Sequence, residues 1–189
     1  MERREEIKVF LNATSSVLFE KYVGLPPIIG SSKKQTFVDI KLKVQSKLNG
    51  WKGKILSQGG REVLIKSIAK AILVYAMNCF MLPAGFCNEI NSMMGQFWWG
   101  QKQEEKKFHW LSWKQLCFSK KDGGLGFRDL RSFNLALLAK QGWRLLHCQD
   151  SLFYKVFKSK YFSDGSFLDA PIPSHSSYAW RVLLRVGLS

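Results

Sequence analysis

Apolar residues recur every three or four positions over residues 33–48, which is the spacing of an amphipathic helix. The positions on the apolar face are Phe37, Ile40, Val44 and Leu48. Ser32 and Gln35 have the spacing of a capping box, so we expect the helix to begin at residue 33. Asn49 and Gly50 favour a helix end and predict that the helix stops there.

The longest apolar run of the chain follows a glycine pair. Because glycine lowers helix stability, Gly59 and Gly60 predict a break between a basic loop and a helix over residues 61–81. Pro83 disfavours helical geometry at the residue before it and should end this helix. A third amphipathic pattern follows, so residues 33–98 predict a compact helical bundle.

The remaining segments extend a mainly α fold. Residues 22–29 contain two prolines and several β-branched side chains, which predict a short extended segment. Beyond the bundle, the periodicity predicts a turn or short helix at 108–117 and helices at 132–148, 150–161 and 178–186. Irregular loops should join these elements.

A polar and charged stretch is the best candidate for a domain boundary. It divides the chain into an unassigned segment at 1–20, a first part at 21–100, a linker at 101–107 and a second helical part at 108–189. The first part would hold the helical bundle.

Charge points to a polyanionic partner. The 29 Lys and Arg against 14 Asp and Glu give a net charge of +15, which attracts nucleic acid by releasing its counterions. The basic residues are spread along the chain, which argues against a membrane surface. Lys66, Lys70 and Asn78 interrupt the longest apolar run, so it does not predict a membrane span. The N-terminus lacks the pattern of a secretion signal, and the protein is expected not to be secreted.

The sequence offers no catalytic or metal-binding pattern. Its aspartates and glutamates are isolated or lie in charged segments, whereas two-metal nucleotidyl transfer needs grouped carboxylates. The four cysteines have no C-x-x-C pair, so we expect them to be reduced and mostly buried, without a metal. The glycines of residues 120–127 match no phosphate-binding motif and predict a plain turn. No catalytic residue, metal, cofactor or small-molecule ligand is expected.

Basic side chains around the first two helices are the candidate nucleic-acid contacts. The candidate residues are Lys33, Lys34, Lys47, Trp51, Lys52, Lys54, Arg61 and Lys66. For the lysines, a solvated helix face explains the pattern as well as duplex contact does. For Trp51 the alternative is packing over the end of the first helix. Five other tryptophans are assigned to packing: Trp98, Trp99, Trp110, Trp113 and Trp143.

Six blocks in order along the chain resemble the plant LINE-type (non-LTR) retrotransposon reverse transcriptase. They are Y-V-G-L-P at 22–26, K-L-x-G-W-K-x-K at 47–54, L-S-x-x-G-R-x-x-L-I-K at 56–66, F-W-W-G at 97–100, G-G-L-G-F-R-D at 123–129 and N-x-A-L-L-A-K-Q at 134–141, with Trp143 and Arg144 following. Similar pieces occur as plant mitochondrial open reading frames. The resemblance covers roughly residues 20–186.

The resemblance implies a place in a larger enzyme. Residues 22–24 would match the primer-grip end of the palm, and the helices over 33–98 would match the thumb, which holds the template-primer duplex. Residues 108–186 would match the linker ahead of a zinc-binding segment and a ribonuclease H domain. The palm with its metal-binding carboxylates would precede residue 20, and the ribonuclease H part would follow Ser189.

The resulting expectation is a fragment without catalytic activity that keeps a nucleic-acid-binding thumb. One alternative is an adopted small basic protein of a plant organelle that binds RNA or a protein partner, and another is a functionless relic. The parent element would act in the nucleus, whereas an organelle-encoded copy would lie in the mitochondrion. The sequence leaves the oligomeric state open.

Overall fold

The computed structural model describes residues 33–52, 56–100, 108–163, 165–170 and 176–187. Over these residues the fold is mainly α and contains no strand, which confirms the predicted fold class. The helices are α2 (Lys33–Lys52), α3 (Gln58–Cys79), α4 (Ala84–Trp98), α5 (Trp113–Leu116), α6 (Leu130–His147), α7 (Leu152–Tyr161) and α8 (Tyr178–Gly187), with a 3-10 turn, η1, at Lys120–Asp122. The extended segment predicted at 22–29 and the linker predicted at 101–107 lie outside the described residues.

The end of α2 differs from the prediction. The helix continues through Asn49 and Gly50 to Lys52, although those two residues favour a stop. The Trp51 ring lies 6.4 Å from the Phe97 ring of α4, at 54° to it. This contact needs the last turn to remain helical, and the packing of two aromatic rings outweighs the local preference of one Asn-Gly pair.

The start of α3 also differs from the prediction. Ser57 is the N-cap residue, and its hydroxyl accepts a 3.2 Å hydrogen bond from the Gly60 amide. Gly59 and Gly60 therefore lie inside the first helical turn and do not precede it. A serine cap satisfies one of the free amides at a helix start, which offsets the low helix propensity of the glycines. The helix ends at Cys79, four residues before Pro83.

The later helices agree with the predicted pattern to within about two residues. Asp129 caps α6 by accepting a 2.9 Å hydrogen bond from the Ser132 amide, so α6 begins at Leu130. Ser151 caps α7 in the same way through the Tyr154 amide. These caps explain the starts of both helices.

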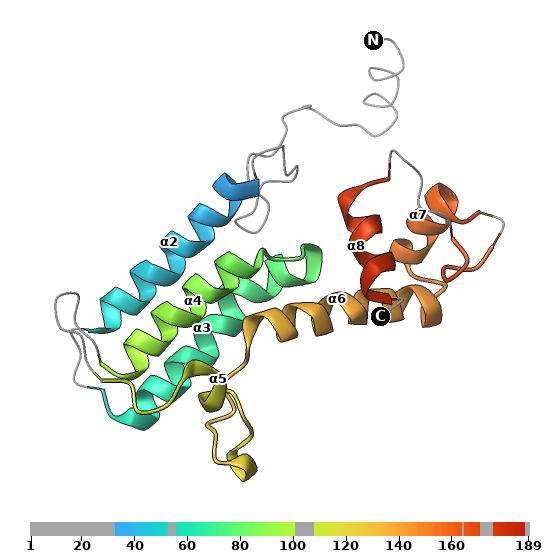
Figure 1. The fold of residues 1–189 in the computed structure, drawn as a ribbon. Helices are drawn as coiled ribbons and strands as arrows, with labels where there is room; N and C mark the ends of the chain where they lie inside the picture. The colour runs from blue at the N-terminus through green and yellow to red at the C-terminus, as the bar shows by residue number, and fades with distance from the viewer. Residues whose placement is uncertain (1–32, 53–55, 101–107, 164, 171–175, 188–189) are drawn as a thin grey trace. The chain divides into compact units, whose positions relative to one another are not determined.

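Residues from Asp39 to Ser189 form one compact unit. In this unit α6 contacts α3 and α4 near one end and α7 and α8 near the other (Figure 1). The buried leucines of α6 lie along its whole length, at Leu130, Leu138 and Leu145. Since α6 follows the predicted linker and α3 and α4 precede it, the two predicted parts share a core. The domain boundaries themselves stay a prediction.

An aromatic cluster forms the core around α8. Trp180 is fully buried, and its ring lies parallel to Tyr161 at 4.5 Å and to Phe162 at 5.7 Å. Phe167 meets it edge-on at 5.6 Å. Rings of this size bury much apolar surface, and the cluster holds α7 and α8 against the C-terminal end of α6.

Candidate nucleic-acid-binding surface

The exposed face of α2 carries two lysines that no described acidic residue pairs with. Lys43 and Lys47 are exposed and lie four residues apart, which places them on one side of the helix. Neither forms an ion pair with a residue that the structure describes. Lys41, in contrast, pairs with Glu89 of α4 at 2.8 Å. Lys47 is among the candidate site residues predicted from the sequence, and Lys43 is not. The four-residue spacing between them indicates that Lys43 lies on the same side of the helix.

Three predicted site residues lie on α2 with side chains that the structure does not describe: Lys33, Lys34 and Lys52. Lys54 lies outside the described residues altogether. Trp51 is half-buried against Phe97, a contact that supports packing and leaves part of its surface accessible. The structure therefore brings Lys47 and Trp51 onto the same C-terminal half of α2.

Arg61 is engaged with the end of α4. Its Nη1 donates a 3.2 Å hydrogen bond to the Trp98 carbonyl, one of the last carbonyls of that helix. A cation at a helix C-terminus is stabilised by the exposed carbonyl groups there. Arg61 thus joins the beginning of α3 to the end of α4. This contact is structural, and a role of Arg61 in binding nucleic acid stays a prediction.

Lys66 is also held by the protein. Its Nζ donates to Glu62 Oε1 at 2.7 Å and to the Leu125 carbonyl at 3.0 Å. Lys120 binds the same Glu62 oxygen at 3.1 Å. The hydrogen bond from Lys66, followed by that from Lys120, holds the pKa of Glu62 below its ordinary value. Glu62 compensates both lysines, so Lys66 contributes less free positive charge than the sequence predicts.

The glycine loop that contains Leu125 is a tight turn, as predicted. Gly123 and Gly126 have positive φ angles of 79° and 67°, which favour glycine. A Cβ atom on Gly124 would lie 2.1 Å from the Phe118 carbonyl oxygen. Backbone hydrogen bonds close the turn, among them Leu125 N to Leu116 O at 3.0 Å. The turn places the Leu125 carbonyl where it accepts the hydrogen bond from Lys66 of α3.

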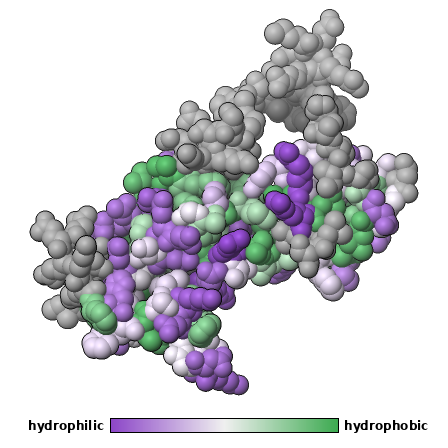
Figure 2. All heavy atoms as spheres, in the orientation of Figure 1, coloured by the Kyte–Doolittle hydropathy of each residue, from purple (hydrophilic) through white to green (hydrophobic). Residues whose placement is uncertain are grey.

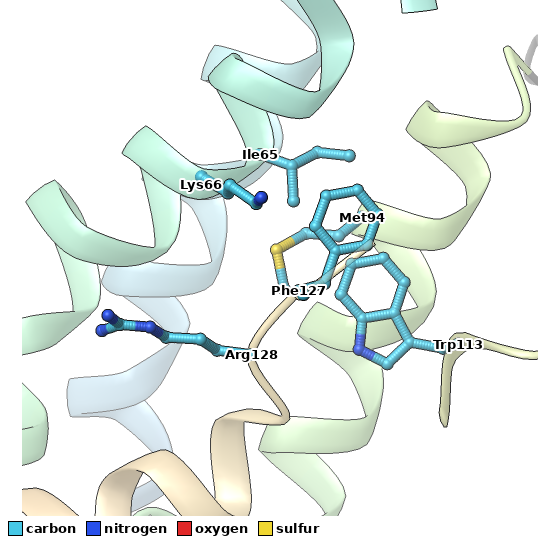
Figure 3. A pocket seen from close by; sticks show the side chains of 7 residues that line it. Ile65, Lys66, Met94, Trp113, Phe127 and Arg128 are labelled. Atoms are coloured by element: carbon cyan, nitrogen blue, oxygen red, sulfur yellow. The ribbon is translucent and has the colours of Figure 1, made fainter. Parts of the chain in front are cut away.

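A cavity of about 230 Å³ lies where this loop meets α3 and α4 (Figure 3). Its lining residues are Ile65, Lys66, Met94, Trp113, Gly126, Phe127 and Arg128. The Trp113 and Phe127 rings are parallel, 5.1 Å apart, and Figure 3 shows the Lys66 amino group directed toward Phe127. Trp113 Nε1 is buried and has no hydrogen-bond partner within the described ranges. The lining holds donors and no carboxylate, so it is unsuited to a metal ion.

Two of the five tryptophans assigned to packing are largely exposed. Trp98 and Trp99 do pack: Trp98 is buried, and Trp99 stacks on His109 at 5.9 Å. Trp110 is 77% exposed and Trp143 is 62% exposed. Their sequence spacing resembles that of buried aromatic residues, but each lies on a side of its segment that no other described element covers.

The cysteines are all free, and the expectation that most are buried is wrong. Cys87 is buried, Cys79 and Cys117 are half-buried, and Cys148 is exposed at the end of α6. Burial, together with the nearby Asp129, raises the pKa of the Cys87 and Cys117 thiols to about 11. Two of the four thiols are therefore poor nucleophiles.

Over the described ranges, no three His, Cys, Asp or Glu side chains come together in a way that would hold a metal ion. None of the helices within these ranges has the length and apolar character needed to cross a membrane. On the face shown in Figure 2, hydrophobic side chains reach the surface in separate patches between hydrophilic ones.

Two curated proteins of Arabidopsis thaliana are similar to this chain. It is 44% identical over 115 residues to "Uncharacterized mitochondrial protein AtMg00310", which corresponds to 60% of this chain and 75% of that protein. It is 38% identical over 167 residues to "Putative ribonuclease H protein At1g65750", or 87% of this chain and 27% of that protein. The chain thus spans about a quarter of the second relative. No family model and no solved structure matches it significantly.

Both similarities are consistent with a sequence derived from a plant retroelement. The chain belongs to the family of the mitochondrial protein AtMg00310. Neither relative is named as a reverse transcriptase, so the LINE-type origin stays a prediction.

Proposed function

We propose that this chain is a non-catalytic fragment of a LINE-type reverse transcriptase that retains a basic, template-primer-binding thumb. The six motif blocks support this origin. The longer relative adds support through its name, because a ribonuclease H part is expected in the parent element. In this proposal α2, α3 and α4 correspond to the thumb helices.

Two lysines of α2, Lys43 and Lys47, have no ion-pair partner among the residues that the structure describes, and this is the observation that carries the proposal. Lys43 and Lys47 point from one exposed face, whereas the neighbouring Lys41 is neutralised by Glu89. The whole helix holds six lysines and one acidic residue, Asp39. A helix with this imbalance binds phosphates by releasing counterions, and each phosphate contact adds to the salt dependence of binding. The duplex would lie along this face, with Trp51 at its C-terminal end.

Binding to a labelled RNA–DNA primer-template duplex, measured by fluorescence anisotropy at several salt concentrations, tests the proposal. The Lys43→Glu/Lys47→Glu variant should bind at least about 10-fold more weakly and show a salt slope lower by roughly 2. The matched control is Lys114→Glu/Lys121→Glu, which makes the same change in net charge at two exposed lysines away from α2. Equal losses in both variants would show that only the net charge matters, and the proposed surface would be wrong.

The absence of catalysis in this proposal has its own test. Incubation with a primer-template, deoxynucleoside triphosphates and Mg²⁺ or Mn²⁺ should give no primer extension. Two-metal nucleotidyl transfer needs carboxylates that come together around the ions. Metal-dependent extension by the purified chain would overturn this part of the proposal.

The similarity to a mitochondrial protein favours a second candidate function, an organellar RNA-binding protein. This candidate predicts a preference for structured RNA over a primer-template duplex of the same length. Competition between the two ligands at one salt concentration distinguishes the candidates. A functionless relic would instead be expected to aggregate through exposed apolar side chains, and a soluble monomer that unfolds cooperatively would contradict it.

A further inference from the structure

The C-terminal half of α6 carries an exposed aromatic pair. The Trp143 and His147 rings lie 3.8 Å apart at an angle of 17°, and Trp143 is 62% exposed. His147 Nδ1 lies 3.1 Å from the Trp143 carbonyl. The imidazole covers one face of the indole, so the open surface of Trp143 includes its other face. The stack also holds the indole in one orientation.

The open face of the Trp143 indole is apolar surface that a flat ligand can cover. Exposed tryptophan keeps apolar surface in water, and Trp180 shows that this chain buries tryptophan where a core is available. A ring that is already held in place loses little conformational entropy on binding a flat ligand. The open indole face therefore suits a planar group that stacks.

Two basic residues lie close to Trp143 in α6. Lys140 lies three residues before Trp143 on the same side of α6, and Arg144 follows it; both are exposed. Arg144 is held by Gln141 at 3.1 Å and lies 5.5 Å from the Phe153 ring centre. Helices α6, α7 and α8 together carry eight Lys and Arg and no Asp or Glu. A planar ligand at Trp143 is thus favoured if it carries negative charge.

We propose that Trp143 is a stacking site for an unpaired base of single-stranded nucleic acid, with Lys140 contacting an adjacent phosphate. Base stacking on an exposed aromatic ring within a basic groove is the way sequence-tolerant single-strand binding works. The site is separate from α2 and shares with the proposed function only the premise that the chain binds nucleic acid. It would hold an unpaired strand while α2 holds a duplex.

A labelled ten-nucleotide oligothymidylate, and the same length of abasic oligonucleotide, test the site by fluorescence anisotropy. Trp143→Ala should weaken binding of oligothymidylate by roughly 5- to 100-fold, and Trp143→Phe should keep most of the affinity. Neither change should affect the abasic oligonucleotide, which has phosphates but no bases. Lys140→Gln should lower the salt slope by about 0.7 for either ligand.

The matched control is Trp110→Ala, which removes a tryptophan of similar exposure outside α6. It should leave oligothymidylate binding unchanged. Unchanged binding by Trp143→Ala would overturn the site, and so would equal losses for both oligonucleotides or equal losses in the two alanine variants. If the protein is a dimer that Trp143→Ala converts to a monomer, the face is a self-association surface and the proposal is wrong.

Failure of this site and failure of the α2 surface give different results. Trp143→Ala should not change the affinity for the primer-template duplex. Lys43→Glu/Lys47→Glu should not change the stacking contribution, which is measured as the ratio of the oligothymidylate affinity to the abasic affinity. Circular dichroism of each variant checks that α6 remains helical.

Discussion

Asn134 of α6 accepts a 2.8 Å hydrogen bond from the Leu82 amide, 52 residues earlier in the chain. The same side chain donates to the Met77 carbonyl at 2.8 Å and to the Phe80 carbonyl at 2.9 Å. These three backbone groups lie at and just after the end of α3, where a helix leaves carbonyls without partners. One buried amide therefore ends α3 and fixes the start of α6 against it.

Replacing Asn134 should destabilise the fold strongly. Asn134→Ala leaves two carbonyls and one amide unpaired in the core, and each buried unpaired group costs about 1–3 kcal/mol. We expect the free energy of unfolding to fall by about 3 kcal/mol in urea titrations followed by circular dichroism. Asn88→Ala, on the exposed side of α4, is the control and should change stability by less than about 0.5 kcal/mol. Similar effects in both variants would contradict the role of the Asn134 amide.

Gly124 should tolerate no side chain. The Cβ of Gly124→Ala would overlap the Phe118 carbonyl oxygen, so the loop must open and loosen its contacts with α3. Such overpacking costs about 1–3 kcal/mol. Gly85→Ala is the matched control, because nothing lies near its Cβ position and it is helical. That variant should be unchanged or more stable by at most about 1 kcal/mol. A Gly124→Ala protein as stable as the wild type would show that the loop adapts freely.

Local patterns predicted the helices well, because periodicity and caps act within a few residues. Asp129 and Ser151, for example, cap α6 and α7 close to the predicted starts. Patterns failed where a distant partner decides the outcome. Gly50 stays helical because Trp51 packs on Phe97, which is 46 positions further along the chain.

The candidate site shows the same limit more clearly. Basic residues at helical spacing identified the region around α2. Spacing does not distinguish Lys47, which has no ion-pair partner in the described part of the chain, from Lys66, which binds Glu62 and the Leu125 carbonyl. The Leu125 carbonyl that accepts from Lys66 lies on a glycine loop 59 residues further along the chain. In the same way, the spacing of Trp143 resembles that of a buried residue, and only the packing around α6 shows that it is exposed.

Glu62 should make stability depend on pH. Its pKa is lowered in the folded chain, so its carboxylate stabilises the fold above pH 4.5, the ordinary value, and this contribution is lost as the pH falls through the folded pKa. Glu62→Gln should lower stability by about 1 kcal/mol at pH 7, with the difference from wild type shrinking below pH 4.5. Urea titrations at several pH values measure it.

The control for Glu62 is Glu89→Gln, which breaks the more exposed ion pair with Lys41. Its effect at pH 7 should be smaller, because water screens exposed pairs. A Glu62→Gln difference that stays constant between pH 7 and pH 3 would mean that the carboxylate charge contributes nothing.

The cysteines should react at very different rates in the folded protein. Cys148 is exposed, whereas the raised pKa of Cys87 leaves about 100-fold less thiolate than an ordinary cysteine with a pKa of 9.0. At pH 8 a maleimide reagent should modify Cys148 first, with mass spectrometry showing a single fast addition that Cys148→Ser removes. Cys87 should react only in denaturant. Fast modification of Cys87 under native conditions would show that α4 separates readily from the core that buries this thiol.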